Sequence, residues 1–154
     1  MPEEGEDLVM HITKKYGPAL AAKFSKPDNP LYLAGQKVGI AFTPNRKIMP
    51  TYRSHQVMEF ANKLSFEKGA DIMQALFKNY FEGGKNVYDP NVLLEICSSY
   101  FNDNEITEII NILANNSLLD EVNRKVDNAR QKLRVTGVPY FIIGQQKFQV
   151  IYLL

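Results

Sequence analysis

Apolar residues recur at intervals of three and four through most of the chain, up to about residue 134. This spacing places them on one face of a helix, so the pattern predicts a series of short amphipathic helices. The period is clearest late in the chain, at Leu119, Val122, Val126, Ala129 and Leu133. The predicted helices span residues 7–16, 18–25, 31–38, 51–64, 72–80, 91–101, 102–113 and 119–133, with a brief extended piece at 39–42.

Three short motifs mark helix boundaries. Asp89 followed by Pro90 is typical of a helix start, because aspartate caps free backbone N–H groups and proline suits the first helical position. Asn102 with Glu105 three residues later matches a capping box. The Gly-Gly pair at 83–84 predicts the end of the helix before it.

The pattern changes near the C-terminus. β-branched and aromatic residues fill 138–143 and 148–154, on either side of a Gly-containing turn at 144–147. This composition predicts a β-hairpin. Because two strands alone are at best marginally stable in water, the hairpin must pack on the helices or join a larger sheet.

The length of 154 residues fits one domain. We expect an α+β, mostly helical fold over residues 1–154, with a helical part at 7–134 and a C-terminal β-hairpin at 138–154. Apolar residues make up 45% of the chain and charged residues 23%, which indicates a globular protein rather than a disordered chain.

Charge gives no reason to expect a nucleic acid or an anionic membrane as partner, because 18 Lys and Arg residues oppose 17 Asp and Glu residues. The acidic start at residues 2–7 is unlike a secretory signal, and no apolar run reaches the roughly 20 residues of a membrane helix. The expected location is therefore cytoplasmic.

The chain has one cysteine and two histidines. Cys97 shares a helical face with Leu93 and Ile96, so we expect a buried, inert thiol. His55 points away from the apolar face of its helix, which indicates either a solvent-exposed side chain or one that lines a groove. His11 shares no metal-ligand spacing with these residues, so no metal site is expected.

The most informative segment is Thr136–Gly144, with the sequence TGVPYFIIG. Taken alone, this segment indicates only a turn that leads into a strand beginning with proline, and this simple interpretation has about even odds. Placed after a long helix, it resembles the cis-proline loop and following strand of DsbA-like, thioredoxin-fold disulfide oxidoreductases. Other segments resemble that family in the same order: residues 1–5, Met49–Pro50 followed by Ser54–His55, and 76–84 through 89–94.

The resemblance implies a partial thioredoxin-like fold with a large helical insertion, to which residues 76–94 are similar. In the family this loop faces the redox cysteines. The resemblance therefore implies a cis Val138–Pro139 bond and substrate binding by Thr136, Gly137, Val138 and Pro139. It also gives His55 a role in lining the substrate groove.

Within the superfamily the chain is most similar to the cytosolic branch of FrnE-type dithiol-disulfide isomerases. Kappa-class glutathione transferases and 2-hydroxychromene-2-carboxylate isomerases share the architecture. The resemblance implies a thiol or disulfide substrate as partner and no cofactor, except that a kappa-type relative would bind glutathione.

The chain departs from the family pattern at both ends. The family's first strand, its Cys-Pro-x-Cys segment and its second strand would precede Met1, and a closing helix would follow Leu154. We therefore expect a truncated oxidoreductase domain that is inactive by itself, because disulfide exchange needs a second thiol. The alternatives are a kappa-type transferase or isomerase relative and a non-catalytic interaction module, and the exposed sheet edge predicts a homo-oligomer.

Overall fold

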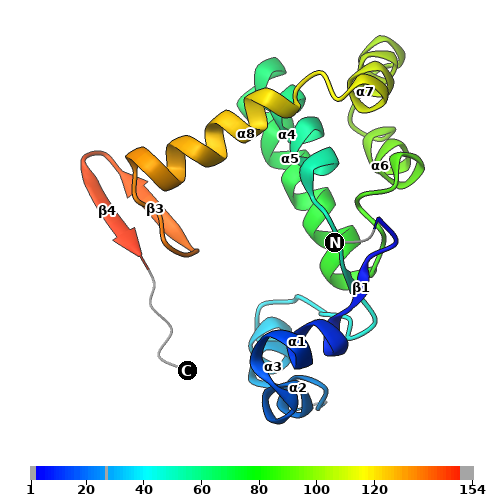
Figure 1. Ribbon diagram of the computed structural model, residues 1–154. Coiled ribbons are helices and arrows are strands. Elements are labelled where there is room, and N and C mark those ends of the chain that lie inside the picture. The colour runs from blue at the N-terminus through cyan, green and yellow to red at the C-terminus, as the bar shows by residue number, and fades with distance from the viewer. Residues whose placement is uncertain (1–2, 27, 150–154) are drawn as a thin grey trace. The chain divides into compact units, whose positions relative to one another are not determined.

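The computed structural model describes residues 3–26 and 28–149. The chain divides into two units, one ending at Leu119 and the other beginning at Asp120, and each is described by itself. Helices dominate, and two strands near the C-terminus form a hairpin (Figure 1). The predicted α+β, mostly helical class with a C-terminal hairpin is therefore confirmed. In the described residues, no helix combines the length and the apolar character needed to cross a membrane.

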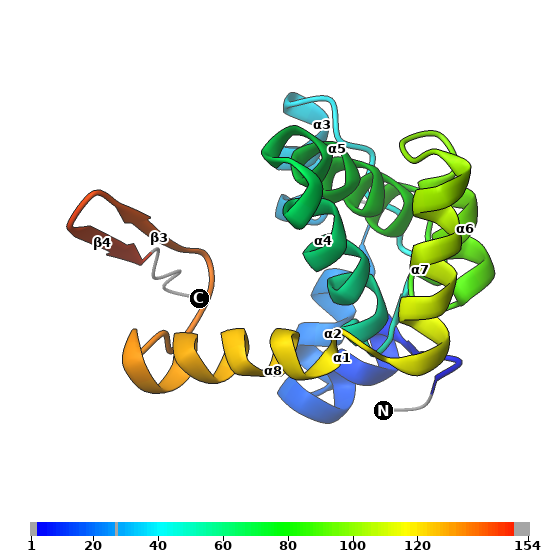
Figure 2. The same cartoon turned by 90° about the horizontal axis from the view of Figure 1, so that it is seen from above.

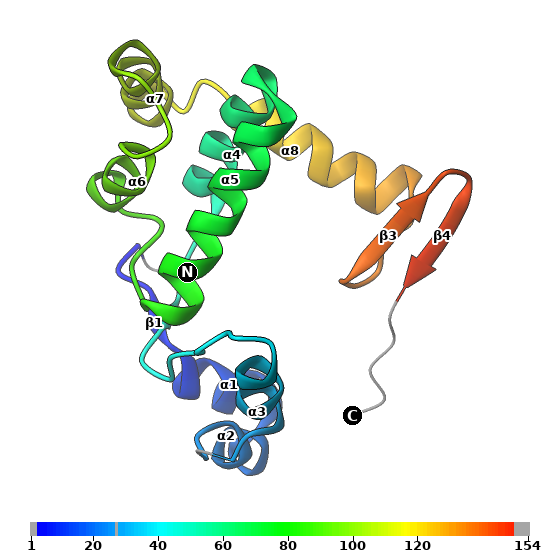
Figure 3. The same ribbon diagram turned by 180° about the vertical axis from the view of Figure 1, so that it is seen from behind.

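Three short helices and a two-stranded ladder begin the first unit. They are β1 (Glu6–Asp7), α1 (Leu8–Tyr16), α2 (Pro18–Phe24), α3 (Pro30–Lys37) and β2 (Lys47–Ile48). β1 pairs antiparallel with β2, and Figure 3 shows the three helices grouped together. Leu8, Ile12 and Ala21 form a small buried core between α1 and α2. The predicted helices are confirmed here, whereas the ladder is not predictable because two-residue strands leave no periodic pattern.

Four further helices form the main core of the first unit. They are α4 (Tyr52–Leu64), α5 (Phe66–Phe77), α6 (Pro90–Cys97) and α7 (Asp103–Asn115). α4 contacts α5 and α7, and α6 contacts the same two helices, so all four surround one core (Figures 1 and 2). The sequence predicts an apolar face of α4 at Val57, Phe60, Ala61 and Leu64. The first three residues are buried, as predicted, whereas Leu64 at the end of the helix is 42% exposed.

The predicted starts of α6 and α7 are also confirmed. Pro90 is the first residue of α6, and a side-chain oxygen of Asp89 accepts a hydrogen bond of 2.8 Å from the Asn91 N–H. At α7 the side chain of Asn102 accepts a bond of 3.0 Å from the Glu105 N–H. The Glu105 carboxylate accepts a bond of 2.9 Å from the Asn102 N–H in return, which completes the capping box.

α6 ends at Cys97, so the prediction of a helix over 91–101 was wrong at its C-terminal end. The Cys97 carbonyl accepts hydrogen bonds from the N–H groups of Tyr100 (2.9 Å) and Phe101 (3.1 Å), which turn the chain. Phe101 is nevertheless buried, with its ring centroid 5.9 Å from that of Phe60. The apolar stripe therefore continues past the helix because the turn returns Phe101 to the core.

Two α-helices continue into π-helical turns that the apolar period does not predict. α5 continues into η1 (Lys78–Glu82), and α8 (Leu119–Asp127) continues into η2 (Asn128–Lys132). The Gly83 N–H donates to the Lys78 carbonyl at 3.1 Å, and the Leu133 N–H donates to the Asn128 carbonyl at 3.1 Å. Both bonds span five residues, as in a π-helix. The helix predicted over 119–133 is therefore present to Lys132, with a π-helical end that the apolar period does not predict.

The second unit contains the predicted hairpin. Its strands are β3 (Tyr140–Ile143) and β4 (Gln146–Gln149). They pair antiparallel with Phe141 opposite Phe148. The connecting turn is shorter than the predicted 144–147, because β4 begins at Gln146, and the positive φ of Gly144 (62°) suits a two-residue turn. Residues 150–154 of the predicted hairpin lie outside the described residues.

A buried amide joins α4 to the segment after α7. Gln56 has no exposed surface, its Nε2 donates to the side-chain oxygen of Asn116 at 3.2 Å, and its Oε1 accepts from the Leu118 N–H at 3.2 Å. Asn116 ends α7 in the left-handed conformation with φ 50°, which asparagine tolerates. The Gln56 side chain therefore holds the chain reversal after α7 while its own polar atoms stay satisfied.

Replacing this amide tests how much the reversal depends on it. Gln56→Ala is expected to lower the free energy of unfolding by about 2 kcal/mol, because it leaves the Leu118 N–H without its partner and opens a cavity. Urea unfolding followed by circular dichroism measures the change. The matched control is Gln36→Ala on α3, where the side chain is exposed. Equal unfolding midpoints for the two variants would contradict the role of Gln56.

Candidate functional site

The loop from Thr136 to Pro139 lies in the second unit, between η2 and β3. Arg134 precedes it with a positive φ of 55°, and the Val135 N–H donates to the Ala129 carbonyl at 3.0 Å, so the chain turns sharply after η2. The Val138–Pro139 bond is cis, as predicted. Val138 is 84% exposed, which leaves an apolar side chain open to a binding partner.

His55 lies on α4 in the first unit, and its side chain is exposed. Its Nδ1 is 2.7 Å from the Thr51 carbonyl, which can only accept, so Nδ1 carries the proton and Nε2 is the acceptor of the neutral ring. The predicted outward orientation of His55 is confirmed. Its predicted role in a substrate groove stays a prediction, because His55 and the Thr136–Pro139 loop belong to different units.

Cys97, the chain's one thiol, has no exposed surface at the end of α6. Burial raises the pKa of the Cys97 thiol to about 12, because a thiolate is poorly solvated among apolar side chains. A thiol must ionise before it can attack a disulfide. The predicted buried, inert cysteine is therefore confirmed in its burial, and the raised pKa opposes a nucleophilic role.

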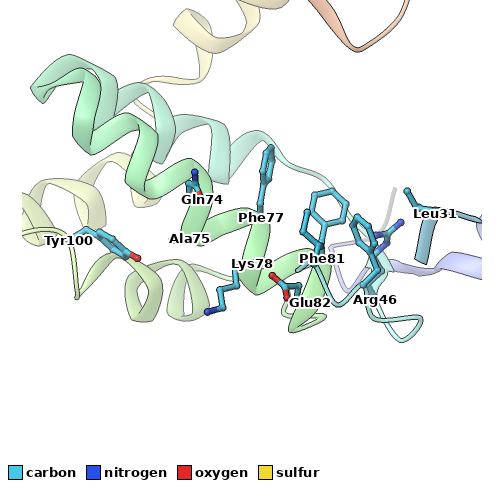
Figure 4. A pocket seen from close by; sticks show the side chains of 11 residues that line it. Leu31, Arg46, Gln74, Ala75, Phe77, Lys78, Phe81, Glu82 and Tyr100 are labelled. Atoms are coloured by element: carbon cyan, nitrogen blue, oxygen red, sulfur yellow. The ribbon is translucent and has the colours of Figure 1, made fainter. Parts of the chain in front are cut away.

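A cavity of about 700 Å³ opens in the first unit between the segment after α3 and the end of α5 (Figure 4). No pattern in the sequence predicts this cavity. Phe77 and Phe81 are four residues apart and so share a helical face, but Phe42 and Arg46 come from a loop. Only the folding of the loop onto α5 and η1 brings these four side chains together.

Metal binding has no support in the described part of the chain, where no three His, Cys, Asp or Glu side chains are placed to share an ion. A family model described as a DsbA-like thioredoxin domain matches residues 11–151. The chain belongs to this family. The match includes both His55 and the Thr136–Pro139 loop, the two places where the sequence predicts substrate contacts. No curated protein shows significant similarity to the chain.

In this DsbA-like domain, the one thiol and the exposed loop have different surroundings. Cys97 is enclosed by the main core of the first unit, whereas Val138 is open to solvent in the second. A redox cysteine of the usual kind lies in an exposed, electropositive setting with a lowered pKa. Cys97 has neither property, so its place in the domain is that of a core residue.

The reactivity of Cys97 provides a direct measurement. At about pH 8 a thiol with a pKa of about 12 is ionised in only about one molecule in ten thousand, and the native protein is expected to react very slowly with Ellman's reagent. In denaturant the pKa returns to its ordinary value, and one thiol per chain should react within the mixing time. Cys97→Ser serves as the blank. A rapid reaction of the native protein would show that the thiol is accessible.

Proposed function

We propose that this chain is a domain of a protein thiol–disulfide oxidoreductase of the FrnE-type branch, and that its Thr136–Pro139 loop contacts the substrate. The family match over residues 11–151 is the observation that carries the proposal. The exposure of Val138 adds support, because an unfolded polypeptide substrate presents apolar side chains that such a surface can cover.

The chemistry needs more thiols than these 154 residues contain. A thiolate attacks one sulfur of the substrate disulfide, a mixed disulfide forms, and the other substrate sulfur leaves as a thiolate. A second protein thiol then attacks the mixed disulfide and releases the reduced substrate. Cys97 is the chain's one thiol and is buried, so in this proposal the chain supplies substrate contacts and does not turn over by itself.

A second candidate function, a non-catalytic interaction module, is favoured by the surface of the hairpin. Phe141, Ile143 and Phe148 are 52%, 67% and 45% exposed. Phe141 and Phe148 are opposite each other and Ile143 is two residues along β3, so all three share one face of the ladder. An apolar face on a ladder whose outer strand edges have no partner among the described residues favours association with another chain, including a second copy.

An activity measurement tests the proposed lack of turnover. The purified chain is expected to leave insulin reduction by dithiothreitol at the buffer rate and to leave scrambled ribonuclease inactive, because no second thiol can resolve a mixed disulfide. Cys97→Ser should behave identically. Turnover that the wild-type chain shows and the variant loses would mean that Cys97 is catalytic.

The substrate contact of the loop is tested separately with unfolded ribonuclease whose cysteines are blocked by alkylation. Val138→Asp is expected to weaken its binding by about three- to tenfold, because the variant loses an apolar contact and adds a charge. Fluorescence anisotropy of a labelled substrate measures the affinity.

The matched control is Phe66→Asp, because Phe66 is 83% exposed and lies at the start of α5, where an acidic residue suits the helix. Equal weakening by both variants would argue against a specific loop contact. Weakening by Ile143→Lys without an effect of Val138→Asp would instead favour the interaction module.

A further inference from the structure

The cavity in the first unit has the size and composition of a small-molecule site. Its volume of about 700 Å³ falls within the usual range of ligand pockets. The lining surface is mainly apolar, and Arg46, Gln74, Lys78 and Glu82 are its charged and amide side chains. Its apolar lining residues include Leu31, Ile40, Phe42, Phe77 and Phe81.

Phe81 organises the apolar wall. Its ring meets Phe42 edge to face at a centroid distance of 5.9 Å, and it meets Phe77 at 5.6 Å. Phe77 is 54% exposed, so the open side of this aromatic group faces solvent where no ligand is bound. Covering such a ring with an apolar group removes it from water and is favourable.

Arg46 provides a charge beside this wall. Its guanidinium carbon lies 4.9 Å from the centroid of the Phe81 ring, and Figure 4 shows the two side chains next to each other. The Nε and Nη1 atoms of Arg46 are buried and have no hydrogen-bond partner among the described residues. Buried donors without acceptors destabilise the protein, so an acceptor supplied by a ligand would restore bonds that the fold leaves unmade.

The π-helical turn η1 adds the other charged groups. Lys78 and Glu82 are its first and last residues, and both line the cavity. Glu82 already accepts a hydrogen bond of 3.1 Å from the Ala41 N–H, which ties the turn to the loop opposite. Arg46 and Lys78 are positive and Glu82 is negative, so the lining has a net charge of +1. π-Helical turns such as η1 are frequent at functional sites.

We propose that this cavity binds a small monocarboxylate with an aromatic or branched apolar body. The body covers Phe77 and Phe81, the carboxylate lies toward Arg46, and Lys78 adds positive charge elsewhere on the lining. Arg46 lines the cavity, and guanidinium donors bind carboxylates with charge-assisted hydrogen bonds. The proposal rests on the first unit alone and is independent of the oxidoreductase function.

Phenylbutyrate is a suitable probe because it joins an aromatic ring to one carboxylate, and phenylbutyramide is its uncharged analogue. Binding to the full chain is measured by chemical shifts of backbone amides in nuclear magnetic resonance. The acid is expected to shift amides of residues 40–46 and 74–82 and to bind about tenfold more tightly than the amide. Equal affinity for the two probes, shifts confined to other segments, or no binding would overturn the proposal.

Substitutions then assign the contacts. Arg46→Met keeps an apolar side chain over Phe81 but removes the charge, and is expected to weaken phenylbutyrate binding by about tenfold without changing phenylbutyramide binding. The matched control, Arg130→Met, removes an exposed cation of the second unit and should change neither affinity.

Two exposed lining residues keep the test decisive if Arg46→Met does not fold. Lys78→Met is expected to weaken the binding of phenylbutyrate by about two- to fivefold, because the Lys78 charge is exposed and screened by solvent. Phe77→Ala should weaken the binding of both probes by about three- to tenfold, because the aromatic contact is lost. Unchanged binding of the acid to both variants would overturn the placement of the ligand.

Discussion

The first unit depends on burying one face of α4 completely. Val57, Phe60 and Ala61 lie on this face with at most 4% of their surface exposed, and α5 and α7 pack around it. The same face includes Gln56, whose amide could not be buried without partners. Asn116 and the Leu118 N–H satisfy it, so the path of the chain after α7 is fixed by a polar requirement inside an apolar core.

Several large apolar side chains stay exposed outside this core, and some of them lie on the proposed binding surfaces. Phe77 is exposed at the cavity, Val138 in the loop before β3, and Phe141 and Ile143 on the hairpin. Exposed aromatic and branched side chains gathered in one place are unfavourable in water unless something covers them. The small cavity fits a small molecule, whereas the open loop and hairpin suit an extended polypeptide.

The loop proposed to contact the substrate and the one cysteine of this DsbA-like domain have opposite surroundings, because Val138 is 84% exposed and Cys97 is buried. Here the one thiol of the 154 residues is a core side chain whose raised pKa follows from its burial. Packing and nucleophilicity are opposing uses of a cysteine, because solvent and cationic neighbours stabilise the thiolate that an apolar core excludes.

The sequence by itself determined the elements that depend on interactions between residues close together in the chain. The face of α4, the Asn102–Glu105 capping box and the strands around Gly144 were all predictable, because each depends on residues within a few positions. Tertiary structure decided the features that depend on distant partners. The Thr43 N–H bonds to the Phe81 carbonyl at 2.8 Å, and this contact holds the loop with Arg46 against η1. No periodicity encodes a contact between residues so far apart, so the cavity emerged only when the chain folded. The hydrogen bonds of the π-helical turns and of the turn after α6 are local, but the apolar pattern contains no sign of them.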